Sequence, residues 1–110
     1  MAIDARIVLP GICLFEMRYG YAKIDRRASS ESQLETLLLR GIAIAPFGAE
    51  DAAHAGDIRA ALEAKGTPIG AYDCLIAGQA RCRGATLVTA NMREFDRVPG
   101  LLVVDWASAR

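Results

Sequence analysis

The stretch GTPIGAYDCLIAG, residues 66–78, contains the strongest local structural signals in the chain. Gly66 and Pro68 end a helical pattern that opens at Glu50, and Gly70 precedes a further helix that we predict over residues 71–83. The residues predicted to face inward on this second helix are Tyr72, Leu75, Ile76 and Ala80. The stretch is therefore expected to join two helices through a tight turn.

Short apolar runs on both sides of this helix pair predict strands. The other predicted elements are a strand over residues 6–9, a helix over about 11–24, a helix from the capping box at 30–33 to Gly41, strands over 42–47, 86–89 and 101–104, and a loop with one helical turn over 90–99. Pro10 suits the first turn of the helix that follows it. Because helices separate most of the strands, we predict an α/β fold with a small, mainly parallel sheet flanked by helices.

The composition favours one compact domain over residues 1–110, since 53% of the residues are hydrophobic and only 6% are aromatic. Thirteen basic residues balance thirteen acidic ones, so any contact with nucleic acid must be local. Arginines do cluster, although a solvated helix face gives the same pattern. The pairs are Arg26 and Arg27, Arg81 and Arg83, and Arg93 and Arg97.

The three cysteines and the first residues indicate the compartment. Cys13, Cys74 and Cys82 have no metal-binding spacing, and we expect them to be reduced thiols. The opening residues MAIDARIVLPG support neither a signal peptide nor a transmembrane span. The chain is expected to be soluble and cytoplasmic, with no membrane partner.

Three acidic residues differ from the rest in their surroundings. Glu16 lies inside an apolar helical run, Asp73 lies in the first turn after Gly70, and Glu94 follows the strand that ends at Thr89. The acids expected at the surface include Glu31, Glu35, Glu50, Asp51, Asp57 and Glu63.

The carboxyl ends of parallel strands share one edge of a sheet, so Asp73 and the 91–94 loop are expected to meet there. Carboxylates brought close together repel unless a divalent cation neutralises them, which indicates Mg²⁺ or Mn²⁺ and favours phosphodiester hydrolysis. A structural alternative stays open. Asp73 also suits helix capping, and Glu16 could pair with Arg18 or Lys23 at the surface.

The hydroxyl, amide and imidazole groups have similar alternatives. Thr89 and Asn91 could orient a metal-bound water or a phosphate, yet both are also ordinary residues at a strand exit. His54, the single histidine, lies among alanines on an amphipathic helix, where a structural role is expected.

Three segments in order resemble the PIN-domain ribonucleases, specifically the VapC-type toxins of type II toxin–antitoxin systems. LFEMRYG (residues 14–20) resembles the second-acid helix of that family, residues 58–78 resemble its third-acid region, and residues 85–101 with Asp105 and Trp106 resemble its C-terminal signature. The resemblance covers nearly all of residues 4–106.

This resemblance implies a PIN-like three-layer fold and a metal-dependent endoribonuclease that cuts structured RNA, such as tRNA. Glu16, Asp73 and Glu94 match catalytic acids, and Glu16, Asp73, Asn91 and Glu94 match ligands of Mg²⁺ or Mn²⁺. Whether Asn91 or Glu94 fills the fourth ligand position stays open. The residues expected to bind RNA are Arg93, Arg97 and Thr89. A cognate VapB-like antitoxin and a homodimer are the implied partners.

The family pattern also opens with a strand that carries an Asp-Thr-Asn-like motif, and these 110 residues contain no match to it. Asp4 precedes the strand that leads into the Glu16 helix and does not replace that acid. We therefore expect a domain that is incomplete at its N-terminus, with weakened metal binding. The alternative is a catalytically inactive PIN remnant that binds an antitoxin or dimerises.

Overall fold

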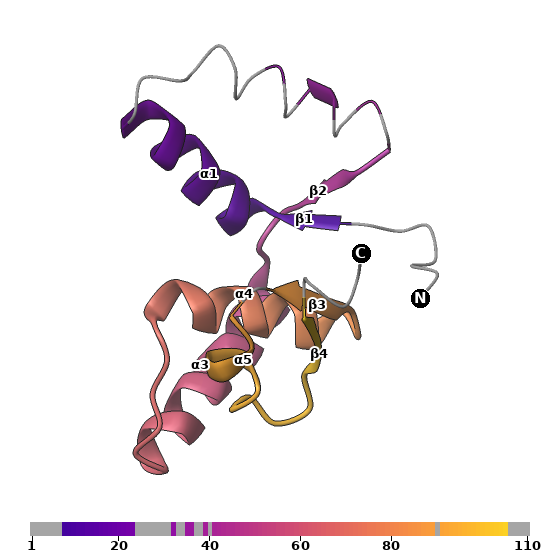
Figure 1. The fold of residues 1–110 in the computed structure, drawn as a ribbon. Coiled ribbons are helices and arrows are strands. Elements are labelled where there is room, and N and C mark those ends of the chain that lie inside the picture. The colour runs from indigo at the N-terminus through magenta and orange to yellow at the C-terminus, as the bar shows by residue number, and fades with distance from the viewer. Residues whose placement is uncertain are drawn as a thin grey trace. The chain divides into compact units, whose positions relative to one another are not determined.

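A computed structural model describes residues 8–23, 32, 35, 36, 39, 41–89 and 91–105. The chain divides between Pro46 and Phe47 into two compact units (Figure 1). Within the described ranges, every helix is too short or too polar to cross a lipid bilayer. The structure is an α/β fold in which all the described strand pairs are parallel, as predicted.

The N-terminal unit contains β1 (Val8–Pro10), α1 (Gly11–Lys23) and β2 (Ala43–Ala45). β1 and β2 pair in parallel with Leu9 opposite Ile44, and α1 contacts both strands. The helix predicted over 11–24 is confirmed up to Lys23, the last described residue. The prediction for Pro10 was wrong: it is the last residue of β1, where the lost amide donor is tolerated at the strand end.

The helix predicted between residue 30 and Gly41 lies mostly outside the described residues. Those that are described, at positions 32, 35, 36 and 39, are helical, and the Thr36 hydroxyl donates a hydrogen bond of 3.0 Å to the Ser32 carbonyl. Gly41 follows with a φ of +87°, a conformation that favours glycine and suits a helix end.

The C-terminal unit is built on α3 (Ala49–Ala64) and α4 (Ala71–Cys82), which pack against each other. Ile58 and Leu62 of α3 are almost fully buried, and α4 buries the run from Ile76 to Ala80. The helices are unusually close where Gly78 lies against Ala55, because a Cβ on Gly78 would be 2.6 Å from the Ala55 backbone. Tyr72 was predicted to face inward, but this prediction was wrong, since 51% of its surface is exposed.

The remaining elements are β3 (Thr86–Thr89), the short helix α5 (Met92–Phe95) and β4 (Leu102–Asp105). β3 and β4 pair in parallel, and the described strands form two two-stranded sheets, one in each unit. Phe95 and Val98 are each 4% exposed and anchor the α5 turn in the core of this unit. The helical turn predicted inside the 90–99 loop is therefore confirmed.

Candidate functional site

Asp73 lies in the first turn of α4, as predicted, and its side chain is half-buried. Gly70 is the N-cap of this helix, and its carbonyl accepts a hydrogen bond of 3.0 Å from the Cys74 backbone amide. An Oδ atom of Asp73 is 3.4 Å from the position that a Cβ on Gly70 would occupy. Glycine at position 70 therefore leaves room beside the carboxylate.

Cys74 is the buried neighbour of Asp73. Loss of solvation on burial raises the pKa of the Cys74 thiol, so the thiol stays protonated at neutral pH. A protonated thiol is a poor metal ligand and a poor nucleophile. The oxygen atoms of Asp73 are therefore the chemically useful donors at the start of α4.

The end of β3 brings Thr89, Asn91 and Glu94 into one short segment. The backbone amide of Asn91 donates a hydrogen bond of 3.0 Å to the Thr89 hydroxyl oxygen, which orders the strand exit. The hydroxyl proton of Thr89 can then be donated to another group. Asn91 is exposed at the start of α5, and Glu94 is half-buried within this turn. Thr89 is half-buried and Arg93 is exposed.

Asp105 is an acid at this edge that the sequence reasoning did not select. It is paired directly with Thr89 in the β3–β4 register, and it is half-buried. In-register residues of neighbouring strands share a face of the sheet, so Asp105 lies beside Thr89. The available signals were its place in the C-terminal signature and its position next to a short apolar strand.

Arg97 does not simply project into solvent as expected for an RNA contact. One terminal nitrogen of its guanidinium donates a hydrogen bond of 3.0 Å to the Pro68 carbonyl, in the turn that leads into α4. Arg97 thereby connects the segment after α5 with the segment before α4.

Glu16 lies on α1 in the N-terminal unit, and its side chain is exposed. On the same helix, the Lys23 ammonium lies 5.8 Å from the centroid of the Tyr19 ring. The other predicted site residues belong to the C-terminal unit.

The chemistry of the donor set suits Mg²⁺ or Mn²⁺, because Asp73, Asn91 and Glu94 offer carboxylate and amide oxygens. Mg²⁺ is commonly held by one or two carboxylates together with water. Among the residues that the structure describes, no three His, Cys, Asp or Glu side chains are grouped closely enough to hold an ion.

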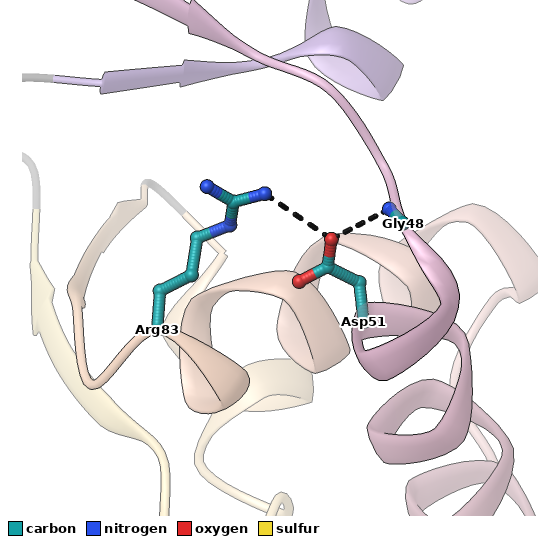
Figure 2. A network of polar contacts seen from close by, with 3 residues as sticks. All are labelled: Gly48, Asp51 and Arg83. Atoms are coloured by element: carbon teal, nitrogen blue, oxygen red, sulfur yellow. Dashed lines mark hydrogen bonds and ion pairs between the residues drawn. The ribbon is translucent and has the colours of Figure 1, made fainter.

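Asp51 was predicted to lie at the surface, and this was wrong, because only 3% of it is exposed. An Oδ atom of Asp51 accepts hydrogen bonds from the Gly48 amide at 2.7 Å and from the Arg83 guanidinium at 3.2 Å (Figure 2). The bond from Gly48 is the main reason that the pKa of Asp51 is lowered; burial opposes this effect and Arg83 reinforces it. Asp51 is a structural carboxylate that caps α3 and links it to the end of α4.

The sequence did contain a signal for the capping of α3, although not for the contact with Arg83. Residues 48–51 read GAED and residues 70–73 read GAYD, so α3 and α4 each carry an Asp three positions after the residue that precedes the helix. The two carboxylates differ in burial, since Asp51 is enclosed and Asp73 is half-exposed. That difference favours Asp51 as the structural member and Asp73 as the accessible one.

His54 has the structural role that was expected. Its Nδ1 accepts a hydrogen bond of 3.0 Å from Arg81 Nε. Arg81 also donates to the Pro99 carbonyl at 3.1 Å, so it joins α3, α4 and the segment before β4.

Comparison with known proteins gives consistent matches. The model of the PIN domain family matches residues 1–101. The chain is 39% identical over 102 residues to a tRNA(fMet)-specific endonuclease VapC of Salmonella typhimurium, covering 93% of this chain and 76% of that protein. It is 38% identical over 106 residues to Ribonuclease VapC2 of Rickettsia felis, covering 96% of this chain and 78% of that protein.

Solved structures agree with the sequence matches. DNA-bound VapBC from Salmonella typhimurium superposes with a TM-score of 0.84 at 40% identity, covering 92% of this chain and 76% of that one. VapBC2 from Rickettsia felis, bound to a promoter DNA fragment, superposes with a TM-score of 0.85 at 39% identity, covering 92% of this chain and 75% of that one.

Proposed function

The chain belongs to the PIN-domain family, among its VapC-type members, and on this premise we propose that it is a metal-dependent endoribonuclease that hydrolyses phosphodiester bonds of structured RNA, such as tRNA. The observation that carries the proposal is the match to VapC ribonucleases over more than nine-tenths of the chain. The accessible Asp73 carboxylate, held at the start of α4, supports it.

We assign the metal ligands to Glu16, Asp73, Asn91 and Glu94, all of which offer oxygen donors. A bound Mg²⁺ or Mn²⁺ would polarise the phosphate and lower the pKa of an attacking water. The protein's own part is to orient these oxygens and to seat the RNA. Thr89 suits this second task, because its hydroxyl proton can be donated to a phosphate oxygen while its oxygen holds the Asn91 amide. Arg93, exposed on α5, supplies a positive charge nearby.

We also propose a VapB-like antitoxin as the partner of this chain, and self-association as a homodimer. Solved neighbours of the chain are VapBC assemblies. On α1, Phe15 and Tyr19 lie one helical turn apart with 53% and 59% of their surface exposed, which suits contact with a partner. The same face would serve the second candidate function, a catalytically inactive module that binds an antitoxin or dimerises.

The test of the enzyme proposal is cleavage of tRNA by the purified chain in the presence of Mn²⁺ or Mg²⁺. Asp73→Asn removes the accessible carboxylate and should reduce cleavage by about a hundredfold or more. Asp57→Asn is the matched control, because Asp57 is an exposed acid on α3 and its replacement should leave the rate unchanged. Equal background cleavage by all three proteins would overturn the enzyme proposal and favour the inactive binding module.

A further inference from the structure

Two arginines form hydrogen bonds that connect the segment after α5 to other parts of the C-terminal unit. Arg81 of α4 donates a hydrogen bond of 3.1 Å to the Pro99 carbonyl, and Arg81 also contacts His54 of α3. Arg97 donates a hydrogen bond of 3.0 Å to the Pro68 carbonyl. The segment from Arg97 to Pro99 is thus connected both to the helix pair and to the turn before α4.

Arg97 forms hydrogen bonds with the α5 turn, which carries Glu94, and with the turn that precedes α4, the helix of Asp73. Its backbone amide donates a hydrogen bond of 3.2 Å to the Glu94 carbonyl, and its side chain holds the Pro68 carbonyl. Pro68 lies two residues before Gly70, which accepts the first hydrogen bond of α4 from Cys74. One residue therefore links the turn that carries Glu94 to the turn that leads into the helix of Asp73.

The segments on either side of the Arg97–Pro68 hydrogen bond are held in place by other contacts. Phe95 and Val98 anchor the α5 turn in the core, and the Thr67 amide donates a hydrogen bond of 2.9 Å to the Leu62 carbonyl of α3. Between Thr67 and Gly70 the chain is exposed apart from the half-buried Ile69, so the bond from Arg97 restrains an otherwise open stretch.

We propose that Arg97 is a positioning residue that sets the spacing between Asp73 and Glu94, rather than a contact for RNA. This inference rests on the proposed function, because the spacing matters only if the two carboxylates hold the same ion. It replaces the expectation that Arg97, like Arg93, binds the RNA backbone.

Because Arg97 is positively charged, the direction in which its removal changes the cation affinity tests the proposal. Removal of a positive charge near a cation site should raise cation affinity by Coulomb's law, whereas loss of positioning should lower it. Titration calorimetry of the full 110-residue chain with MnCl₂ measures this without RNA. We expect Arg97→Ala to weaken Mn²⁺ binding about threefold to tenfold, which is less than loss of a direct partner of a ligand. Arg93→Ala is the charge control and should leave Mn²⁺ binding unchanged or slightly tighter.

Arg97→Lys is the conservative variant, because its ammonium can still donate one hydrogen bond to Pro68. It should restore part of the Mn²⁺ affinity and also serves if the alanine variant folds poorly. Hydrogen exchange of the amides of residues 67–74 should be faster in Arg97→Ala and slower again in Arg97→Lys.

Affinity for tRNA in EDTA should change less than about twofold in Arg97→Ala and should fall in Arg93→Ala, since phosphate contacts act without the metal.

The reverse pattern overturns the inference: Arg97→Ala would keep its Mn²⁺ affinity and its exchange rates but lose affinity for tRNA in EDTA. Absence of Mn²⁺ binding by the unsubstituted chain is a different result. It would overturn the metal site of the proposed function, and the positioning role with it. The titration of the unsubstituted chain therefore distinguishes failure of the proposed metal site from failure of the positioning role of Arg97 alone.

Discussion

At the scale of the single residue, the folded state depends on the charged form of Asp51. Its carboxylate is buried and accepts hydrogen bonds from Gly48 and Arg83. Because its pKa is lower in the folded state, the stability it contributes is present above the unfolded pKa of about 3.9 and is lost as the pH falls through the folded value. We predict that Asp51→Asn lowers the free energy of unfolding by about 1 to 2 kcal/mol at pH 7.

Urea unfolding at pH 7, 5, 4 and 3.5 measures the effect of Asp51→Asn. The difference in unfolding free energy between the variant and the unsubstituted chain should shrink as the pH falls from about 5 toward 3.5. Glu50→Gln is the control, since Glu50 precedes Asp51 in the same helical turn but is exposed. A difference that stays constant over this range would mean that Asp51 is not stabilised as its charged form.

At the scale of the element, the contact between α3 and α4 depends on the absence of a side chain at Gly78. A Cβ at that position would lie 2.6 Å from the backbone nitrogen and Cα of Ala55, which are not free to move aside. We predict that Gly78→Ala lowers the free energy of unfolding by about 2 kcal/mol or more, because the helices must separate to admit one methyl group.

Gly56→Ala is the matched control for Gly78→Ala, since it is the same substitution inside α3 with no atom within 4 Å of the added Cβ. It should stabilise the protein by about 0.5 to 1 kcal/mol through helix propensity. Thermal and urea unfolding of both variants report the comparison. If Gly78→Ala also stabilised the chain, helix propensity would dominate at both positions and the close packing would not hold in solution.

The elements were predictable where a local signal was decisive. Gly66 ends its helix as expected, and Gly84 directly follows the helix predicted over residues 71–83; their φ values of +71° and +61° favour glycine. The contacts across the unit were not predictable, because burial depends on partners that are distant in the sequence. Asp51 looked like an ordinary acid of a first helical turn until Arg83, 32 residues later, was found beside it. Arg97 was likewise expected only to bind RNA, since nothing local in the sequence indicates its hydrogen bond to the Pro68 carbonyl.

At the scale of the whole molecule, the candidate site was predicted only as separate segments. Periodicity placed Asp73 at a helix start and Glu94 after a strand, and both positions are confirmed. Their joint binding of an ion depends on how the start of α4 and the turn of α5 are arranged within the C-terminal unit. Such an arrangement is a property of tertiary packing, and it stays a prediction that the Mn²⁺ titration addresses.

The balanced charge of the whole chain predicts how it should bind RNA. Thirteen basic and thirteen acidic residues give the chain no net charge. Only a few local basic side chains can therefore displace counterions from the RNA phosphates. With two or three phosphate contacts, the slope of log affinity for tRNA against log KCl should be about −2, and Arg93→Ala should make it shallower by about 1. Fluorescence anisotropy in EDTA measures this without cleavage. A slope of about −5 or steeper would require a broad basic surface, and the RNA contact would then lie well beyond Arg93 and Thr89.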